Sequence, residues 1–367
     1  MRILLTGGGS GGHVFPLIAV ARKLIQRDEA AELLFIGPDK SSKETFGKEG
    51  INAVSILSGK FRRYFSPFFI VDVLKLPIGF LQAYWHIFWF MPDVVFSKGG
   101  YGSVLPVVIA WLFRIPVIIH ESDSVPGFTN KILAGFSRRV IVSFPESAKF
   151  FPENKTVVTG NPIREELFTK VPKDPGYVLG ISSENPKVLI LGGSQGAKQI
   201  NELLMPALPD FIKKYEIIHQ CGEKNFTNMQ KIAFLELESS EEKKMYHLYP
   251  FLSQDQLASA YALADIIVSR AGSGAIFEIA ASGKPSILIP YMAAAGGHQM
   301  KNAQIYKDAG AARVLRGRNI MPHMLESLID SILGNKEKAA EMSSAARNFS
   351  KPDAAGKIAE EIVRLMY

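Results

Sequence analysis

Two glycine-rich stretches, placed about half a chain apart, constrain the fold of this chain more than any other feature. Gly7–Pro16 reads GGGSGGHVFP and follows the apolar run Met1–Leu5, while GGSQG at 192–196 follows the apolar run Lys187–Leu191. Glycines after a strand let the backbone approach a ligand and leave N–H groups available where the next helix begins. A chain of 367 residues is also too long for one ordinary core. We therefore expect two domains, each opening with a strand, a glycine loop and a helix.

Further apolar runs alternate with helical patterns along the chain. These runs are continuous rather than alternating, which is typical of parallel strands covered on both faces. The expected strands are Met1–Thr6, Leu33–Ile36, Val94–Ser97, Val117–His120 and Val140–Val142, followed by Lys187–Leu191, Ile217–Gln220, Ile266–Ser269 and Ser286–Pro290. The sequence thus predicts the α/β class, with two doubly wound, Rossmann-like domains built on parallel sheets.

The domain boundary is expected at GNPIR, residues 160–164, which a polar connector follows as far as about Pro186. We assign residues 1–163 to the first domain and residues 164–342 to the second. An amphipathic pattern over Ala354–Met366 predicts a helix that packs back onto the first domain, so residues from about 343 to 367 are assigned to it. Ligands of doubly wound domains bind at the carboxyl ends of the strands. We therefore expect the two sheets to face each other across a cleft.

Composition limits the classes of partner. The formal net charge is +7, which favours an anionic partner such as a phosphate or a membrane surface. Nucleic acid is not expected, because no basic stripe carries aromatic residues at readable spacing. The single cysteine excludes a disulfide framework and a thiolate metal cluster. Together with an apolar N-terminal run too short for a signal peptide, this predicts a cytoplasmic protein.

The first glycine loop by itself leaves several interpretations open. Gly7-x-Gly9-x-x-Gly12 fits the dinucleotide-binding fingerprint, but FIGPD at 35–39 has no acidic residue where a nicotinamide cofactor's ribose needs one. The alternative to dinucleotide binding is that this glycine loop is only a tight turn and binds no ligand. His13 follows the turn, and a histidine with a pKa near neutrality can remove a proton from a hydroxyl nucleophile. A local backbone contact is the alternative role for His13.

Seven motifs occur in an order that points to one family. They are GGSGGHVFP at 8–16, KGGY at 98–101, HE at 120–121, GNPIR at 160–164, GGSQGA at 192–197, RAG at 270–272 with Glu278, and HQ at 298–299 with Asn302. Together they resemble the MurG family, the bacterial N-acetylglucosaminyltransferases of peptidoglycan synthesis, over essentially the whole chain. The resemblance implies a two-domain GT-B fold and an enzyme at the cytoplasmic face of the plasma membrane. It also implies inverting transfer of N-acetylglucosamine from UDP-N-acetylglucosamine to the 4-hydroxyl of the muramyl sugar of lipid I, which forms lipid II.

The sequence indicates chemistry without a metal cofactor. Inverting transfer must neutralise the departing diphosphate, and many such enzymes use a metal held by Asp-x-Asp. This chain has no Asp-x-Asp. Glycine-loop amides, a helix N-terminus and a cation are then expected to neutralise that charge.

The resemblance also implies roles for single residues. For the base, the position of His13 after the glycine turn predicts that it removes the proton, with Glu121 as the alternative base. Tyr101 and Glu121 at neighbouring strand ends are expected to orient His13 or relay the proton. Among the donor contacts, Glu278 accepts the ribose hydroxyls and the Leu252 backbone contacts uracil. The full set of expected donor-binding residues is Ser10, Gly11, Gly12, Asp123, Arg164, Ser194, Leu252, Ser273, Gly274, Glu278 and Gln299.

Several of these positions have simpler alternatives or depart from the family pattern. A surface or interdomain salt bridge is the alternative role for Arg164. Charge compensation at a helix N-terminus is the alternative role for Glu278. Ser10 stands where threonine is usual and keeps the hydroxyl. Asp123 replaces an asparagine with a side chain that only accepts hydrogen bonds when ionised, and Gly297 stands where aspartate is common. The last two departures concern the sugar contacts rather than the nucleotide contacts.

An aromatic stretch at 61–92 predicts membrane contact. Prolines at 67, 77 and 92 interrupt it, and the 14 residues between the last two are fewer than the roughly 20 of a spanning helix. Apolar rings near Arg62, Arg63 and Lys75 are typical of a patch that lies on an anionic membrane. The patch residues are Phe68, Phe69, Trp85 and Trp89. A buried helix is the alternative, although a polyprenyl-linked acceptor makes contact with the bilayer necessary.

Other functions share parts of this pattern. A GT-B lipid glucosyltransferase would use a diacylglycerol acceptor, and a non-hydrolysing UDP-sugar 2-epimerase would use the same donor. The epimerase has a soluble substrate, which the aromatic and basic patch disfavours. A nicotinamide dehydrogenase and a non-enzymatic nucleotide-binding scaffold are the remaining alternatives, and the scaffold would not need His13.

Overall fold

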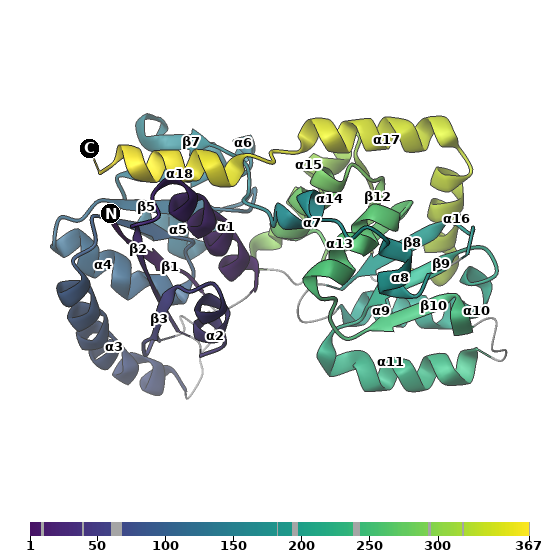
Figure 1. Ribbon diagram of the computed structural model, residues 1–367, viewed down its shortest axis with the longest axis horizontal. Helices are drawn as coiled ribbons and strands as arrows, with labels where there is room; N and C mark the ends of the chain where they lie inside the picture. Colours follow the sequence, from purple (N-terminus) through teal and green to yellow (C-terminus); the bar gives the residue numbers. More distant parts are fainter. Residues whose placement is uncertain are drawn as a thin grey trace. The chain divides into compact units, whose positions relative to one another are not determined.

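The protein forms two compact units in a computed structural model, residues 1–163 with 351–367 and residues 164–350 (Figure 1). The structure describes residues 1–8, 11–38, 40–59, 68–181, 183–192, 197–237, 243–292, 295–317 and 319–366.

The first unit is built on a seven-stranded parallel sheet with the order β3-β2-β1-β4-β5-β6-β7. Its strands are β1 (Arg2–Thr6), β2 (Glu32–Gly37), β3 (Asn52–Ser55), β4 (Val94–Ser97), β5 (Val117–Glu121), β6 (Arg139–Val142) and β7 (Thr156–Val158). Chain order reverses between β1 and β4, which pair with Thr6 opposite Ser97. A ligand of a doubly wound sheet binds at the carboxyl ends of the strands beside such a reversal.

Helices cover both faces of this sheet. One core cluster joins the strands to α1 and α18, and a second joins them to α3 and α4. The helical elements are α1 (Gly11–Arg27), α2 (Lys40–Lys48), α3 (Phe68–Phe90), η1 (Tyr101–Ser103), α4 (Val104–Leu112), α5 (Phe128–Leu133), α6 (Pro145–Ala148), η2 (Glu153–Lys155) and α18 (Ala354–Arg364). Coverage on both faces explains why the strands are apolar without alternation.

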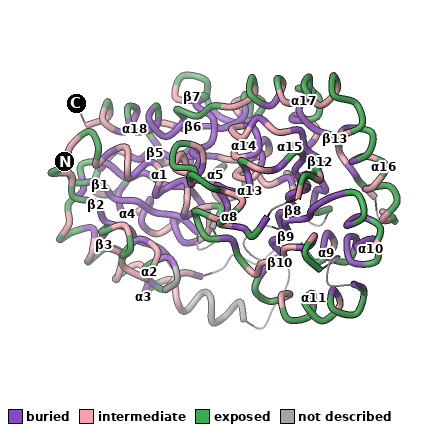
Figure 2. The backbone as a smooth tube through the Cα atoms, turned by 45° about the vertical axis from the view of Figure 1, so that its right-hand side comes forward, coloured by how far each residue is buried: buried purple, intermediate pink, exposed green. Residues whose placement is uncertain are grey.

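The second unit repeats this plan on a six-stranded parallel sheet with the order β10-β9-β8-β11-β12-β13. Its strands are β8 (Lys187–Leu191), β9 (Glu216–Gln220), β10 (Tyr246–Tyr249), β11 (Ile266–Ser269), β12 (Ser286–Leu288) and β13 (Ala312–Val314). Its helical elements are α7 (Glu166–Thr169), α8 (Pro175–Leu179), α9 (Lys198–Leu204), η3 (Met205–Ala207), α10 (Leu208–Phe211), α11 (Glu223–Glu236), α13 (Gln254–Leu263), α14 (Ser273–Ser282), η4 (Ala295–Gly297), α15 (His298–Asp308), α16 (Pro322–Leu333) and α17 (Lys336–Phe349). Figure 2 shows the central strands of both units buried and much of α11 and α16 exposed.

The predicted α/β class with two parallel sheets is confirmed, and all nine predicted strands coincide with strands of the structure. Four strands were not predicted, namely β3, β7, β10 and β13. They lie at or next to sheet edges, where the strand sequences are short and only partly buried. Such strands lack the long apolar runs from which the others were recognised.

The chain returns to the first unit at Lys351 rather than at about residue 343. The earlier position lies inside α17, whose Phe349 packs its ring 5.5 Å from Phe277 and 4.9 Å from Tyr306 in the second unit. The crossing lies beside Gly160, where a Cβ atom would come within 2.5 Å of the Lys351 Cβ atom. Helix α18 then packs on α1, as its amphipathic pattern predicted.

Candidate active site

The ring of His13 is held between two glycine turns of the first unit. His13 lies in the first turn of α1, and a Cβ atom at Gly8 or at Gly100 would come within 3.5 Å of its ring. The Gly8 N–H donates to the Gly99 carbonyl at 3.0 Å, which joins the turn after β1 to the turn after β4. Gly100 has a φ of 84°, a conformation that side chains rarely adopt. The glycines therefore bring backbone against the imidazole at the carboxyl ends of β1 and β4.

The pKa of His13 differs from the one predicted. Its Nδ1 atom is buried and has no hydrogen-bond partner among the described residues. Burial, followed by the charge of Lys98, lowers the pKa of His13 to about 4, while Asp123 opposes this shift. The expectation of a pKa near neutrality was wrong, because the sequence did not reveal that the ring is buried and lies near a cation. His13 is consequently neutral at pH 7 and able to accept a proton.

Lys98 and His120 form a buried polar cluster with Asn161 and Ser143. The Lys98 Nζ atom lies 2.8 Å from His120 Nδ1 and 3.4 Å from Asn161 Oδ1, and His120 Nε2 lies 3.0 Å from Ser143 Oγ. Lys98 and His120 stand in the KGGY and HE motifs, which did not reveal a role for either side chain. The available signal was a lysine at the end of an apolar strand.

Glu121 ends β5 and organises the loop that follows. One carboxylate oxygen accepts the Asp123 N–H at 2.9 Å, and the other accepts the Gly127 N–H at 3.0 Å and the Asn130 Nδ2 at 2.9 Å. Burial, and then the Asp123 charge, raise the pKa of Glu121. Both oxygens are thus engaged within the loop, an arrangement that suits a positioning role. Tyr101 begins η1 directly after the glycine turn, so its backbone lies at the same edge of the sheet.

Two of the predicted donor-binding residues form an ion pair in the second unit. Arg164 Nε lies 2.8 Å from Glu278 Oε1, and Arg164 Nη2 lies 2.9 Å from Glu278 Oε2. The Tyr261 hydroxyl donates to the same carboxylate at 3.4 Å. Burial opposes the charge on Arg164, yet Glu278 outweighs it and raises the pKa of the guanidinium. The pair places a fixed carboxylate on α14 and a fixed cation beside it.

The N-terminus of α14 is open. Gly272, at the cap position, provides no side-chain hydrogen bond, and a Cβ atom at Gly272 or Gly274 would meet no atom within 4 Å. The first N–H groups of a helix have no acceptor within the helix, so this turn presents amides toward open space. Such a terminus favours an anion. Ser273 and Gly274, which the sequence predicted as donor contacts, therefore lie in a turn that favours an anion.

Arg270 and Asn302 hold the turn before α14, a role that the sequence did not reveal. Arg270 Nη1 donates to Gln199 Oε1 at 2.9 Å and to the Ile289 carbonyl at 3.0 Å. Asn302 Nδ2 donates to the Ala271 carbonyl at 3.3 Å. These bonds connect the ends of β11 and β12 with α9 and α15, and so fix the position of the open helix terminus.

Leu252 and Gln299 have partners within the protein. The Leu252 N–H donates to Gln220 Oε1 at 3.1 Å, and Gln299 Oε1 accepts the Tyr291 N–H at 2.9 Å. Gln220, which the sequence did not single out, thereby fixes the backbone that was predicted to contact uracil. Each predicted contact lies near a strand end, at the edge where the open helix terminus also lies.

Some predicted residues lie outside the described part of the chain. These are Ser10 and Ser194, while the side chains of Phe68 and Phe69 are likewise not described. Gly11 and Gly12 begin α1, so their backbone forms its N-terminus. Among the described residues, no three or more histidine, cysteine, aspartate or glutamate side chains gather where they could hold a metal ion.

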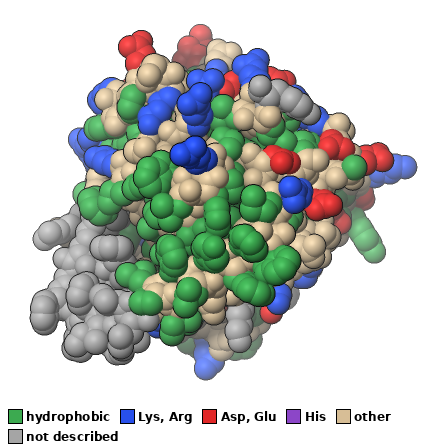
Figure 3. Space-filling model, turned by 90° about the vertical axis from the view of Figure 1, so that its left-hand side faces the viewer, with side chains coloured by type: hydrophobic (Ala, Val, Ile, Leu, Met, Phe, Trp, Pro, Cys, Tyr) green, Lys and Arg blue, Asp and Glu red, His purple; other side chains and the backbone are tan. Residues whose placement is uncertain are grey.

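From Lys75 onward, helix α3 exposes aromatic side chains on one face and buries apolar side chains on the other. Trp85 and Trp89 are 60% and 66% exposed, whereas Ala83 and Ile87 are fully buried. Helix α4 adds further exposed apolar side chains, and Figure 3 shows hydrophobic groups gathered on this side of the first unit. We call the exposed set the apolar patch; its members are Ile78, Leu81, Tyr84, Trp85, Phe88, Trp89, Trp111 and Leu112. The buried-helix interpretation is therefore wrong for the two tryptophans.

The prolines interrupt the 61–92 segment less than the sequence predicted. Helix α3 runs through Pro77 for 23 residues, because its inner face is held against the first unit and Gln82 accepts the Leu57 N–H at 2.8 Å. In the part of the chain that the structure describes, no helix is both long and apolar enough to cross a membrane.

Two family descriptions match this chain. They are the glycosyltransferase family 28 N-terminal domain over residues 3–142 and the glycosyltransferase family 28 C-terminal domain over residues 187–358. A Bacillus cereus protein named UDP-N-acetylglucosamine–N-acetylmuramyl-(pentapeptide) pyrophosphoryl-undecaprenol N-acetylglucosamine transferase 2 is 38% identical over 364 residues, which is 98% of this chain and 99% of the relative. A Treponema denticola transferase of the same name, without the number, is 36% identical and covers 95% of this chain and 94% of its own.

Solved structures agree with these matches. MurG of Acinetobacter baumannii is 29% identical with a TM-score of 0.73 and covers 99% of each chain. UDP-GlcNAc 2-epimerase from Neisseria meningitidis, bound to UDP-GlcNAc, has a TM-score of 0.70 at 15% identity over 99% of this chain and 100% of that chain, a likeness of fold alone. With two family 28 domains, relatives above 35% identity over nearly their whole length and the ordered motifs at the strand ends, the chain belongs to the MurG family of glycosyltransferases.

Proposed function

We propose that the protein transfers N-acetylglucosamine from UDP-N-acetylglucosamine to the 4-hydroxyl of the muramyl sugar of lipid I, forming lipid II. The names of relatives at 36–38% identity over nearly the full length support this substrate pair. The epimerase alternative rests on a fold likeness at 15% identity, which carries less weight. In a bacterial cell this activity belongs to cell wall biogenesis, and through it to cell shape and division.

The neutral ring of His13 at the strand ends carries the proposed chemistry. The acceptor oxygen forms a bond to the anomeric carbon of the sugar, and the bond from that carbon to the UDP oxygen breaks. UDP leaves with the bonding electrons, and the hydroxyl proton passes to the imidazole of His13. One displacement inverts the anomeric centre. Tyr101 and the Glu121 loop orient the acceptor and the base.

The second unit supplies the proposed donor site. The open N-terminus of α14, with Ser273 and Gly274, faces the diphosphate, and Arg164 adds a cation. Glu278 accepts the ribose hydroxyls, and its ion pair with Arg164 holds the carboxylate in one orientation. The remaining proposed donor contacts are Ser194, Leu252 and Gln299 of this unit, and Ser10, Gly11, Gly12 and Asp123 of the first unit. No metal is required in this proposal, because amides and guanidinium neutralise the leaving group.

The apolar patch is the proposed membrane contact. Burying exposed tryptophans at the bilayer interface is favourable, and a positive net charge adds attraction to anionic lipids. The acceptor carries a polyprenyl chain that resides in the bilayer. The protein therefore works as a peripheral enzyme at the cytoplasmic face of the plasma membrane.

A transfer assay tests the function directly. The purified protein is incubated with labelled UDP-N-acetylglucosamine and a short-chain lipid I analogue in the presence of a metal chelator. We expect a disaccharide product with the inverted anomeric configuration. Label recovered instead in a 2-epimerised sugar nucleotide, with or without acceptor, would assign the chain to the epimerase reaction. Transfer to diacylglycerol but not to the analogue would assign it to the lipid glucosyltransferases.

A further inference from the structure

A buried lysine, Lys98, lies beneath the first glycine turn. Lys98 follows β4, its N–H donates to the Thr6 carbonyl at 2.8 Å, and its side chain is only 2% exposed. A buried ammonium is costly unless its N–H groups find acceptors. Here the acceptors are His120 Nδ1 at 2.8 Å and Asn161 Oδ1 at 3.4 Å. The cation is therefore built into the structure and does not merely lie on its surface.

This ammonium sets the tautomer of His120. An ammonium group only donates, so the Nδ1 atom must accept and carries no proton. The ring proton then resides on Nε2, which donates to Ser143 Oγ at 3.0 Å. Burial, with Lys98 as the next cause, lowers the pKa of His120 well below its ordinary value. His120 is thereby a neutral link between the ends of β4, β5 and β6.

Two carboxylates balance the buried charge. Burial lowers the pKa of Lys98 to about 8, while the charges of Glu121 and Asp123 act in the opposite direction. Lys98 is accordingly protonated at neutral pH. In return, its charge opposes the burial and the Asp123 charge that raise the pKa of Glu121. The Glu121 carboxyl group accepts the three hydrogen bonds of the loop after β5.

The same cation acts on His13. The charged groups that affect the ring are Lys98, which disfavours the imidazolium, and Asp123, which favours it; His120 lies near and is neutral. The backbone directly after Lys98 also supports the ring, because Gly99 accepts the Gly8 N–H and Gly100 packs against the imidazole. Charge and geometry thus both connect Lys98 with the proposed base.

We propose that Lys98 is a positioning residue for the transfer reaction. Its ammonium holds His120 in the Nε2–H tautomer and so joins the ends of β4, β5 and β6 beneath the glycine turn that packs against the ring of His13. This inference rests on the proposed function, and it assigns a role to a residue that the motifs left without one.

The first test uses the full-length protein without any substrate. Histidine nitrogen NMR should show His120 with a protonated Nε2 and an unprotonated Nδ1 throughout the neutral pH range. A protonated Nδ1, or a ring that titrates in that range, overturns the proposal. Because no turnover is measured, this result is independent of whether the protein transfers sugar.

The second test compares Lys98→Met with Lys155→Met. Lys155 is a partly buried lysine of the same unit, and its ammonium donates to the backbone carbonyls of Ala134 and Ser137 rather than to a histidine. In Lys98→Met, the nearby cation is lost. The pH at which kcat/KM falls on the acid side of its profile should therefore rise by roughly one unit. The KM for UDP-N-acetylglucosamine should change less than twofold. Lys155→Met should lower Tm and leave that limb in place.

The outcomes distinguish the proposed role of Lys98 from the proposed transferase function. A Lys98→Met enzyme that turns over with the wild-type pH profile overturns the role of Lys98 while leaving the transferase function intact. A wild-type protein that transfers no sugar overturns the function, and the NMR result still decides the tautomer. If Lys98→Met does not fold, the wild-type His120 spectrum remains the deciding measurement.

Discussion

At the scale of single residues, the protonation state of His13 governs the proposed chemistry. A ring whose pKa lies at about 4 is unprotonated over the whole neutral range, so almost every molecule holds the base in its accepting form. The same shift makes the ring a weaker base. Preorganisation between the two glycine turns, rather than basicity, must then contribute most of its effect.

Replacing His13 should reveal this contribution. His13→Ala should lower kcat by about 10²–10⁴-fold, the range of a positioned general base, with UDP affinity nearly unchanged. Wild-type kcat/KM should fall as the pH drops through about 4, because the ring then becomes protonated. Steady-state kinetics and UDP titration calorimetry measure both effects. A larger loss in Glu121→Ala would transfer the role of base to Glu121, and full activity in His13→Ala would remove His13 from the mechanism.

The Arg164–Glu278 pair leads to a second prediction at this scale. Glu278→Ala removes the ribose acceptor and leaves Arg164 without this partner, so UDP binding should weaken by about 1.5–3 kcal/mol, the scale of charge-assisted hydrogen bonds. Glu278→Gln is the matched control, since it keeps an acceptor and loses the charge, and it should weaken UDP less. Calorimetry without added metal measures the difference. Equal UDP affinity in wild type and both variants would refute the donor assignment.

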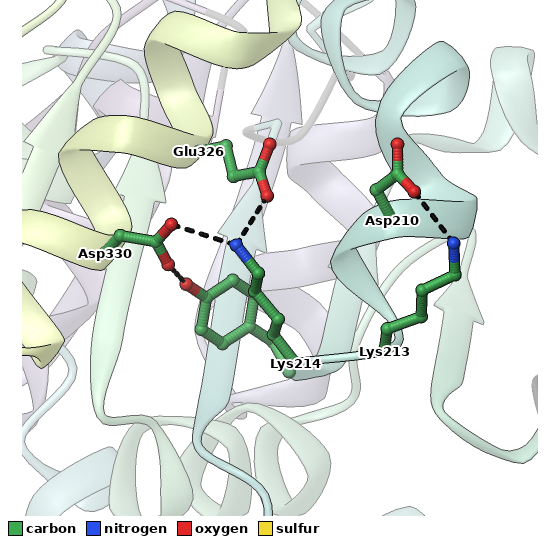
Figure 4. Close-up of polar contacts among 6 residues, drawn as sticks. Asp210, Lys213, Lys214, Glu326 and Asp330 are labelled. Atoms are coloured by element: carbon green, nitrogen blue, oxygen red, sulfur yellow. Dashed lines mark hydrogen bonds and ion pairs between the residues drawn. The ribbon is translucent and has the colours of Figure 1, made fainter.

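At the scale of elements, polar side chains fasten the turn after α10 to α16. Lys214 Nζ lies 2.8 Å from Glu326 Oε1 and 3.0 Å from Asp330 Oδ2 (Figure 4). The Tyr215 hydroxyl donates to the same Asp330 carboxylate. Lys213 instead pairs with Asp210 one helical turn away, which adds no connection between elements. Asp330 is therefore the side chain that two donors share.

This cluster should make unfolding depend on pH. Burial opposes the shift, yet the bonds from Tyr215 and Lys214 lower the pKa of Asp330 below its ordinary value. A carboxyl group with a lowered folded-state pKa stabilises the protein above its unfolded pKa, and that stability is lost as the pH falls below about 4. Wild-type Tm should thus drop further than that of Asp330→Asn between pH 6 and pH 3. Parallel curves for the two proteins would show that the cluster does not contribute.

At the scale of the whole molecule, each unit has a core of its own, and the apolar patch belongs to the first unit alone. Contiguous exposed apolar surface of this kind marks an interaction site on a soluble protein. Because Ala83 and Ile87 of α3 are fully buried while Trp85 and Trp89 are exposed, substitutions of the two tryptophans leave the core intact. The two functions of this helix, packing and docking, are therefore separable by mutation.

Serine at both Trp85 and Trp89 should weaken binding to phosphatidylglycerol vesicles by at least tenfold, because two interfacial aromatic anchors are lost. Activity on a long-chain acceptor should fall, whereas activity on a soluble acceptor analogue should persist. The matched control replaces Phe234 and Leu235 by serine, since these residues of α11 are 69% and 78% exposed and lie in the second unit. Vesicle sedimentation measures the binding. Equal losses in the two double variants would mean that the patch has no specific membrane role.

The sequence by itself determined the features that depend on local pattern. Continuous apolar runs specify strands covered on both faces, and glycines after a strand specify turns that approach a ligand. These signals located nine strands, both glycine loops and the histidine beside the first of them. They also carried the family resemblance, since its motifs are the turns at the carboxyl ends of strands.

Only the tertiary structure decided which charges meet. Lys98 and His120 are 22 positions apart and Arg164 and Glu278 are 114 positions apart, so neither contact leaves a periodic trace in the chain. Protonation states follow from burial and from such neighbours, which is why the pKa of His13 was predicted wrongly. The return of the chain at Lys351 was likewise set by the packing of Phe349 against the second unit. Local pattern fixes where the backbone turns, whereas the free energy of a charge depends on everything packed around it.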